Sequence, residues 1–332
     1  MTRLLAIVDS AEREHFFGGD PEGVLGEADV TLRVEPPMDG EALRELLADF
    51  EPNVVVGAWR MPPLPREGLR ENGGSLDYFC YLSGSVSGKI SKAHLEDGLV
   101  VTNWGSAIGP YVAECTLMLI LCTLRQLSVH SYGLRERGEW RPRLLTNRAL
   151  FGKRVGLHGF GSIAQHLVDL LRPFDCRVTA DTGVPDALLE TYGVRRVASA
   201  DALFAESDVL VELKALTPRT QGCVDERLLR MLPDGAAFIN VSRGAVVKEE
   251  DLIRVASERD LWVGLDVYED EPLPLDSPLR KMDNVFLLPH MGGATRERGL
   301  HCGRLALSNV KRHLAGEPLE NVVTPEVFER AT

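Results

Sequence analysis

The sequence contains little of what several protein classes require. Only six of its 332 residues are cysteines, and they form neither a Cys-x-x-Cys pair nor a cluster with histidine. We therefore expect no disulfide framework and no metal site. Free thiols of this kind indicate a reducing compartment, so we expect a cytoplasmic location. The longest apolar stretch, Cys115–Leu124, is too short to span a bilayer, and the N-terminus lacks the apolar run of a secretory signal.

Positive charge is also scarce. Lys and Arg number 37 against 49 Asp and Glu, which gives a formal net charge of -12. An acidic chain disfavours a nucleic-acid or anionic-membrane partner. The hydrophobic content of 44% is ample for buried cores. A chain of this length favours two domains of ordinary size.

The first hundred residues alternate between strand-like and helix-like segments. Helical spacing appears at 41–50 and 89–97, between four apolar runs that indicate buried strands: 4–8, 53–57, 76–82 and 99–101. Such alternation is typical of a parallel sheet with crossover helices. A long apolar segment, 111–127, then predicts one buried helix.

A second alternating series follows and predicts a doubly wound α/β sheet. Its helical segments include 201–206, 225–231 and 248–258, and its six expected strands are 154–158, 176–180, 208–213, 236–241, 261–267 and 285–288. The last helix, 296–314, comes too late in the chain to extend that sheet. We expect it to return to the first domain.

The joint between the first of these strands and the next helix carries Gly159-x-Gly161-x-x-Ala164. This is the dinucleotide fingerprint, in which the first glycine makes the turn and the second admits a pyrophosphate. We expect the backbone at Phe160, Ser162 and Ile163 to face that pyrophosphate, because a helix N-terminus presents free amides. His158, which precedes the turn, is predicted to be only the last residue of its strand.

Cofactor choice rests on Asp181, which ends the next strand, 22 residues after Gly159. A carboxylate there accepts from the ribose hydroxyls and repels a 2′-phosphate. The following residues, 182–185, are neutral. The sequence therefore predicts NAD.

Three late strands end in side chains suited to chemistry on a keto acid. Arg243 can bind a carboxylate and stabilise negative charge on a carbonyl. His290 can exchange a proton near neutral pH. A carboxylate from residues 269–271 can stabilise the protonated histidine, although spacing alone does not select one. Asp266 can orient the histidine or accept from the nicotinamide carboxamide.

Three of these segments, 239–244, 265–272 and 288–295, resemble the D-isomer-specific 2-hydroxyacid dehydrogenases, and so does Leu216–Thr220. The resemblance implies catalysis by Arg243, Glu271 and His290, with Asp266 near the nicotinamide. It implies cofactor contacts that also include Thr217, Ser242 and Gly292, and a substrate carboxylate held by Gly84, Ser85 and Val86, with Arg243 and His290. The expected reaction interconverts a 2-keto acid and a D-2-hydroxy acid.

The family's architecture implies a Rossmann domain, 105–295, inserted into a flavodoxin-like substrate domain, 1–104 plus 296–332, usually in a homodimer. Several residues depart from the family pattern. Trp104-Gly105-Ser106 replaces Thr-Pro-Gly, and Cys115 and Leu213 stand where histidine is common. The family's acidic ribose residue aligns with Thr182, which leaves Asp181 and Thr182 as alternatives.

Two other functions use the same fold. One is an NAD(H)-sensing corepressor that binds partner proteins. The other is a related dehydrogenase acting on 3-phosphoglycerate or formate. The sequence selects neither the acid nor the direction of the reaction.

Overall fold

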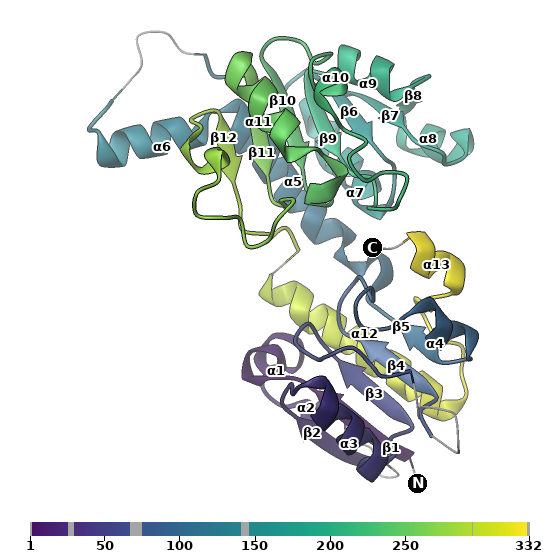
Figure 1. The fold of residues 1–332 in the computed structure, drawn as a ribbon. Helices are drawn as coiled ribbons and strands as arrows, with labels where there is room; N and C mark the ends of the chain where they lie inside the picture. The colour runs from purple at the N-terminus through teal and green to yellow at the C-terminus, as the bar shows by residue number, and fades with distance from the viewer. Residues whose placement is uncertain (1, 26–29, 67–74, 141–145, 294, 331–332) are drawn as a thin grey trace. The chain divides into compact units, whose positions relative to one another are not determined.

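Two parallel β-sheets, each covered by helices, form the fold (Figure 1). The computed structural model describes residues 2–25, 30–66, 75–140, 146–293 and 295–330. The chain divides into unit 1, Met1–Ile108 with Ala294–Thr332, and unit 2, Gly109–Gly293. The first boundary falls four residues later and the second two residues earlier than those expected from the sequence.

Unit 1 contains a five-stranded sheet in the order β2-β1-β3-β4-β5, which is the flavodoxin-like order. Its strands are β1 (Thr2–Ile7), β2 (Val30–Glu35), β3 (Val54–Gly57), β4 (Tyr78–Tyr81) and β5 (Val100–Thr102). Its helices are α1 (Ser10–Phe17), α2 (Pro21–Leu25), α3 (Gly40–Phe50), α4 (Lys92–Glu96), α12 (Arg296–Ala315) and α13 (Pro325–Arg330). The sequence interpretation missed β2, α1, α2 and α13.

Both faces of this sheet are buried, as parallel sheets require. Leu5 and Ile7 of β1 belong to the core that contains Leu43 of α3. Leu4 and Ala6, which point the other way, belong to the core that contains Ala306 of α12. The last long helix, α12, therefore covers one face of the first sheet, as expected.

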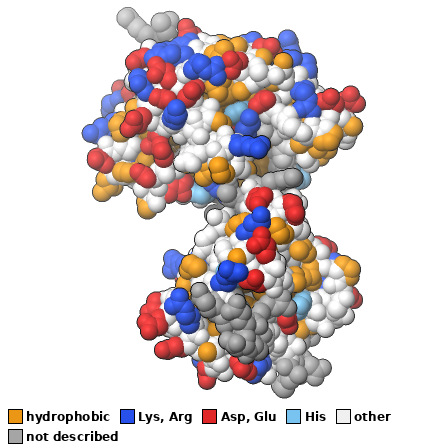
Figure 2. All heavy atoms as spheres, turned by 45° about the vertical axis from the view of Figure 1, so that its right-hand side comes forward, with side chains coloured by type: hydrophobic (Ala, Val, Ile, Leu, Met, Phe, Trp, Pro, Cys, Tyr) orange, Lys and Arg blue, Asp and Glu red, His pale blue; other side chains and the backbone are white. Residues whose placement is uncertain are grey.

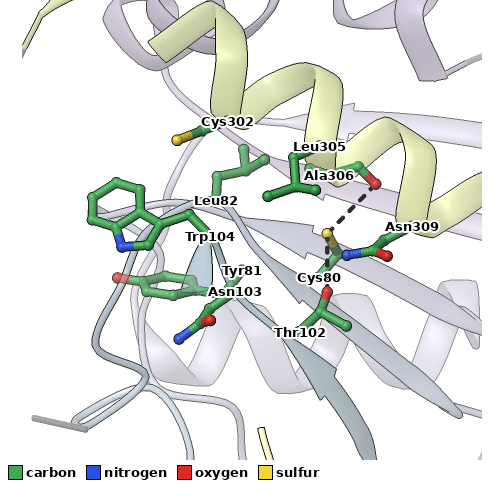
Figure 3. Close-up of a pocket in the computed structure, with 10 residues that line it drawn as sticks. All are labelled: Cys80, Tyr81, Leu82, Thr102, Asn103, Trp104, Cys302, Leu305, Ala306 and Asn309. Atoms are coloured by element: carbon green, nitrogen blue, oxygen red, sulfur yellow. Dashed lines mark hydrogen bonds between the residues drawn. The ribbon is translucent and has the colours of Figure 1, made fainter. Parts of the chain in front are cut away.

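A narrow pocket marks the contact between α12 and the ends of β4 and β5 (Figure 3). There the thiol of Cys80 donates to the carbonyl of Ala306 and accepts from the hydroxyl of Thr102, at 3.8 and 3.6 Å. Burial raises the pKa of this thiol. The protonated thiol is thus a structural donor that fastens helix to strand.

Unit 2 contains a seven-stranded parallel sheet in the order β12-β11-β10-β9-β6-β7-β8. The strands are β6 (Arg154–His158), β7 (Arg177–Asp181), β8 (Arg195–Arg196), β9 (Val209–Glu212), β10 (Ala236–Asn240), β11 (Leu261–Leu265) and β12 (Val285–Leu287). The helices are α5 (Gly109–Leu124), α6 (Leu127–Glu136), α7 (Ser162–Leu171), α8 (Asp186–Tyr192), α9 (Ala200–Glu206), α10 (Glu226–Leu229) and α11 (Glu249–Glu258). This order confirms the predicted dinucleotide-binding sheet. The short β8 was not expected.

The apolar helix predicted over 111–127 is two helices. Gln126 adopts a left-handed conformation (φ 53°), which ends α5 and starts α6. With the turn before it, the segment Gly105–Leu124 is long and apolar enough by composition to cross a membrane, with a mean hydropathy of 1.7. In unit 2, α5 instead packs against β10, β11 and α7. That packing buries 44% of the apolar window.

The ends of β6, β7 and β9 meet at a group of charged side chains. His158 and Glu212 are almost completely buried, at 1% and 0% exposure. Nδ1 of His158 pairs with Glu212, and its Nε2 lies 3.4 Å from Asp181. Lys214 Nζ in turn donates to Asp181 at 2.8 Å. We call these four residues the strand-end network. Burial lowers the pKa of His158, but the charge of Glu212 and the bond to Asp181 outweigh burial and raise it.

The strand-end network predicts an asymmetric response to mutation. Glu212→Leu leaves His158 buried without its main partner. We therefore expect the free energy of unfolding to fall by about 3–5 kcal/mol. The double variant His158→Leu/Glu212→Leu removes both charges and should recover most of that loss. Urea unfolding at pH 6 measures both. A double variant no more stable than Glu212→Leu would contradict this account.

The same network predicts a pH dependence. Because the pKa of His158 is raised above its ordinary 6.5, its contribution to stability is complete below that pH and is lost as pH rises through the raised value. The wild type should therefore lose stability relative to the double variant between pH 6 and pH 9. If the free energies of unfolding of the wild type and the double variant differ by the same amount at pH 6 and at pH 9, His158 does not gain a proton on folding.

Candidate active site

The glycine turn after β6 has the geometry that a dinucleotide needs. Gly159 has φ +114°, and a Cβ there would lie 3.0 Å from the backbone of Leu213 and Lys214. Gly161 is the N-cap residue of α7, so no side chain caps the first amides of this helix. A Cβ on Gly161 would meet nothing within 4 Å. The turn lies at the switch point, because β6 pairs with both β7 and β9. These features fit a pyrophosphate at the start of α7.

The other residues predicted at this turn contribute in different ways. Ser162 and Ile163 form the first positions of α7 and are half-buried. Phe160 is only 4% exposed, and its ring packs edge-on against Tyr192 with centroids 5.7 Å apart. Phe160 can therefore meet a nucleotide only through its backbone.

Two predicted cofactor contacts lie beyond the turn. Asp181 ends β7, and its carbonyl accepts from the Gly159 amide at 3.0 Å. Its neighbours His158 and Lys214 lower the pKa of its carboxyl group well below the usual range. Thr217 follows β9, where its hydroxyl lies 3.0 Å from that of Thr220 and closes a turn. Asp181 and Thr182 are the two candidates for the ribose contact, and only Asp181 has a charged side chain.

Arg243 follows β10 and is held by its own loop. The side chain of Asn240 donates to the Arg243 carbonyl at 3.2 Å, while the Ser242 amide and hydroxyl both donate to Asn240 Oδ1 at 3.1 Å. Gly244 packs directly against the backbone of Tyr268, where any Cβ would overlap it. Burial lowers the pKa of Arg243, and the charge of Glu271 opposes that shift. Arginine nevertheless stays cationic in proteins.

Asp266 anchors the loop that carries the histidine. It follows β11, is 2% exposed, and accepts from the amides of Met291 and Gly292 at 2.7 and 2.8 Å. A Cβ on Gly292 would lie 2.7 Å from the same carboxylate, so this close approach needs glycine. Burial raises the pKa of Asp266, and the two amides partly oppose that shift. With both oxygens engaged, Asp266 positions the loop.

Glu271 is the carboxylate that meets His290. Its Oε2 lies 2.6 Å from His290 Nδ1, and its Oε1 accepts from the Tyr268 amide at 3.1 Å. Glu269 instead exchanges bonds with Glu249. His290 has φ +52°, an uncommon value for a residue with a side chain. The geometry thus selects Glu271 from the three acidic residues that the sequence left open.

Unit 1 carries the remaining predicted residues, Gly84, Ser85 and Val86, in the loop after β4. Trp104 lies against Gly84, where a Cβ would meet its indole nitrogen, and Asn103 donates to the Gly84 carbonyl. The backbone amides of Gly84, Ser85 and Val86 have no hydrogen-bond acceptor within the described part of the chain. The loop therefore offers donors to an anion.

Sequence reasoning missed three residues of unit 2 that support the predicted ones. Tyr268 orients Glu271 through its amide, and its hydroxyl donates to the Leu288 carbonyl at 2.7 Å. Glu212 and Lys214 support Asp181 through the strand-end network. The signal was present in the sequence, because Glu212 and Lys214 are charged residues at the end of an apolar strand.

Comparison with known proteins gives the family. The model of the D-isomer specific 2-hydroxyacid dehydrogenase NAD binding domain matches residues 117–292. The chain is 34% identical over 320 residues to a glyoxylate reductase/hydroxypyruvate reductase of Homo sapiens, covering 87% of this chain and 95% of that protein. It is 32% identical over 234 residues to a D-3-phosphoglycerate dehydrogenase of Methanocaldococcus jannaschii, covering 70% of this chain and 44% of that protein.

Solved structures agree on the fold. A glyoxylate reductase from Paecilomyes thermophila superimposes with a TM-score of 0.82 at 27% identity, covering 98% of this chain and 99% of that one. A D-isomer specific 2-hydroxyacid dehydrogenase from Lactobacillus delbrueckii, solved as an NAD complex, gives 0.81 at 18% identity, covering 97% and 100%. The chain belongs to the D-isomer-specific 2-hydroxyacid dehydrogenases, oxidoreductases that use NAD(H).

Proposed function

We propose that the chain reduces a small 2-keto acid to the D-2-hydroxy acid, and catalyses the reverse reaction, with Arg243, His290 and Glu271 as its working groups. The observation that carries this proposal is the 2.6 Å contact between His290 and Glu271. It leaves the second ring nitrogen of His290 available for a substrate. Arg243 and His290 follow β10 and β12, which both flank β11 in the sheet.

Each group has a distinct task in the proposed reduction. NADH supplies the hydride. The Arg243 guanidinium binds the substrate carboxylate and stabilises the negative charge that develops on the 2-keto oxygen. His290 Nε2 gives its proton to that oxygen, which becomes the hydroxyl group. Glu271 holds Nδ1, so that the ring keeps its orientation and its charged form is stabilised. The amides of Gly84, Ser85 and Val86 are proposed to bind the substrate carboxylate as well.

The names of the relatives support a substrate class. The human relative is named for glyoxylate and hydroxypyruvate, and it matches this chain over 95% of its own length. We propose that a 2-keto acid of similar size is the substrate. 3-Phosphohydroxypyruvate and formate remain in the test panel, because the Methanocaldococcus jannaschii relative is named for phosphoglycerate. Binding of NADH without turnover of any acid would favour the corepressor-like alternative.

The roles of His290 and Arg243 predict large losses of turnover. His290→Gln should lower kcat by about 100- to 10,000-fold, because it removes the proton donor. Arg243→Gln should lower kcat/KM by about 100- to 1,000-fold, because it removes a cation from the developing charge. NADH oxidation with the keto-acid panel measures both. His301→Gln, on the exposed side of α12, is the matched control. Variants that keep wild-type turnover would refute these roles.

The role of Glu271 is separable from that of its neighbours. Glu271→Gln should lower kcat by about 10- to 100-fold, as expected for a group that orients a catalytic side chain. Glu269→Gln should leave kcat unchanged, because Glu269 bonds to Glu249 and not to His290. The proposal is wrong if the two variants behave alike. Circular dichroism of both variants checks that each is folded.

We also propose that the chain acts as a homodimer in a reducing, cytoplasmic environment, with small acids as its partners. Large apolar side chains are exposed in and after α6: Leu127, Tyr132, Leu134 and Trp140, the last at 80%. All six cysteines are free. On the face seen in Figure 2, Lys and Arg are interspersed with Asp and Glu, and the net charge is -12. These features favour self-association over binding to nucleic acid or anionic membranes.

The dimer proposal predicts a mass of 73.2 kDa in solution, twice the chain mass of 36.6 kDa. Tyr132→Glu/Leu134→Glu should produce a monomer, because it places charge in the buried part of the interface. Light scattering after size-exclusion chromatography measures the mass. Phe151→Glu, an exposed apolar residue outside α6, is the control. A wild-type protein that elutes as a monomer at about 50 μM, well above the dissociation constant of a stable dimer, would contradict the proposal.

A further inference from the structure

Two tryptophans of unit 1 hold the start of the loop whose amides are proposed to bind the substrate carboxylate. The loop, residues 83–86, follows β4 and is irregular. The Ser83 carbonyl accepts from the Trp104 amide at 3.1 Å. The Ser83 hydroxyl accepts from the indole nitrogen of Trp59 at 2.7 Å. The direction of the amides of 84–86 therefore depends on where these two tryptophans lie.

The two tryptophans are secured to different degrees. Arg298 of α12 is 1% exposed, and its Cζ lies 4.4 Å from the ring centroid of Trp104 and 5.5 Å from that of Trp59. A cation over an aromatic face is attractive, and more so away from water. Trp104 also packs on Gly84. Trp59 is 40% exposed, so its position depends more on the segment that carries it.

That segment, 59–61, is held by side chains of opposite charge. Lys89 Nζ donates to the carbonyls of Trp59 and Met61, at 2.8 and 2.6 Å. The amide of Arg60, between them, donates to Glu12 Oε1 at 3.0 Å. Glu12 is 2% exposed, and its other carboxylate oxygen accepts an amide at the start of α1. An acid thus holds the central N–H, and a base holds the carbonyls on either side.

Lys89 connects this segment to the far end of the loop. Its own amide donates to the Val86 carbonyl at 3.0 Å. Burial lowers the pKa of Lys89, and the charge of Glu12 opposes that shift. Hydrogen bonds from a charged donor are roughly twice as strong as those between neutral groups. The backbone of Lys89 therefore closes the loop, while its side chain holds the tryptophan that bonds the loop's first residue.

We propose that Lys89 is a positioning residue for the substrate carboxylate. It acts through Trp59 and Ser83 on the amides of 84–86, and it contacts no reacting atom. The inference rests on the proposed function, in which those amides bind the carboxylate. The carboxylate keeps its charge throughout the reduction, so a displaced loop weakens the binding of substrate and transition state alike. Loss of such uniform binding raises KM and leaves kcat unchanged.

Kinetics of Lys89 variants test the proposal. Lys89→Met should raise the KM for glyoxylate and hydroxypyruvate by about 10- to 100-fold, because a binding group misplaced by roughly 1 Å costs that much. Its kcat should change by less than about threefold. Lys89→Arg, which can donate to both carbonyls, should restore most of the wild-type KM. Lys92→Met, which removes an exposed lysine paired with Glu329 at 2.6 Å, is the matched control and should keep the wild-type KM.

A second variant tests whether Lys89 acts through Trp59. Trp59→Phe keeps a ring and removes the indole N–H that reaches Ser83, so it should also raise KM. Adding Lys89→Met to Trp59→Phe should then raise KM little further, because both changes break the same connection. If the two effects on KM multiply in full, Lys89 acts independently of Trp59 and the proposal is wrong.

Binding of oxamate, a carboxylate that resembles glyoxylate and cannot be reduced, separates this inference from the proposed function. Oxamate is titrated into the protein–NADH complex, with nucleotide fluorescence as the readout. Weaker oxamate binding by Lys89→Met, at an unchanged dissociation constant for NADH, would support the inference even if no keto acid were turned over. Turnover of keto acids with the same KM in Lys89→Met and wild type would overturn the inference alone. Wild-type protein that neither turns over a keto acid nor binds oxamate would overturn both. Lys89→Gln, with the same readouts, replaces Lys89→Met if that variant does not fold.

Discussion

The close approach of the glycine turn to the strand beside it determines how unit 2 is organised. Gly159 lies so near the backbone of Leu213 and Lys214 that no other residue fits. This contact joins the end of β6 to the end of β9, the two strands on either side of the switch point. It sets the position of α7 on one side and of the 213–218 loop on the other. Both segments lie at the carboxyl edge of the sheet, where the dinucleotide is proposed to bind.

A second constraint acts at the opposite end of the same edge. Parallel strands bring their carboxyl ends together, so the loops after β10, β11 and β12 are neighbours although they lie far apart in sequence. Arg243, Glu271 and His290 come from these three loops. The left-handed backbone of His290 and the contact of Gly244 with Tyr268 indicate that the loops are packed against one another. Such packing restricts the positions of the three side chains.

The sequence predicts much of this arrangement, and its failures have physical reasons. The strand predicted at 154–158 coincides with β6, because a buried central strand is a continuous apolar run. The edge strand β2 was missed because the strands were predicted from continuous apolar runs, whereas β2 alternates between polar and apolar residues and is only half-buried. The break between α5 and α6 depends on one left-handed residue, Gln126, in a uniformly apolar segment. Composition does not reveal such a residue.

The residues of the candidate site also divide into those that a local sequence pattern predicts and those that it does not. The fingerprint glycines and the strand-end residues Arg243 and His290 are predictable, because a local pattern marks each one. Residue spacing alone does not choose Glu271 over Glu269 and Asp270, because all three are adjacent carboxylates; the family resemblance does imply Glu271, and the fold brings it to His290. Lys214 was missed because its partner is 33 residues away. Pairing across a sheet follows strand order and not sequence distance.

The same kind of hydrogen bonding recurs at both ends of the carboxyl edge of the seven-stranded sheet. At each end a buried carboxylate accepts backbone amides from the next loop: Glu212 from Lys214, and Asp266 from Met291 and Gly292. A buried charge is costly unless it is hydrogen-bonded, so each carboxylate requires its loop to stay in place. The loop in turn carries a basic side chain that reaches solvent, the half-buried Lys214 at one end and the exposed His290 at the other. The cost of burying each acid thus keeps the loop, and with it the basic side chain, in place.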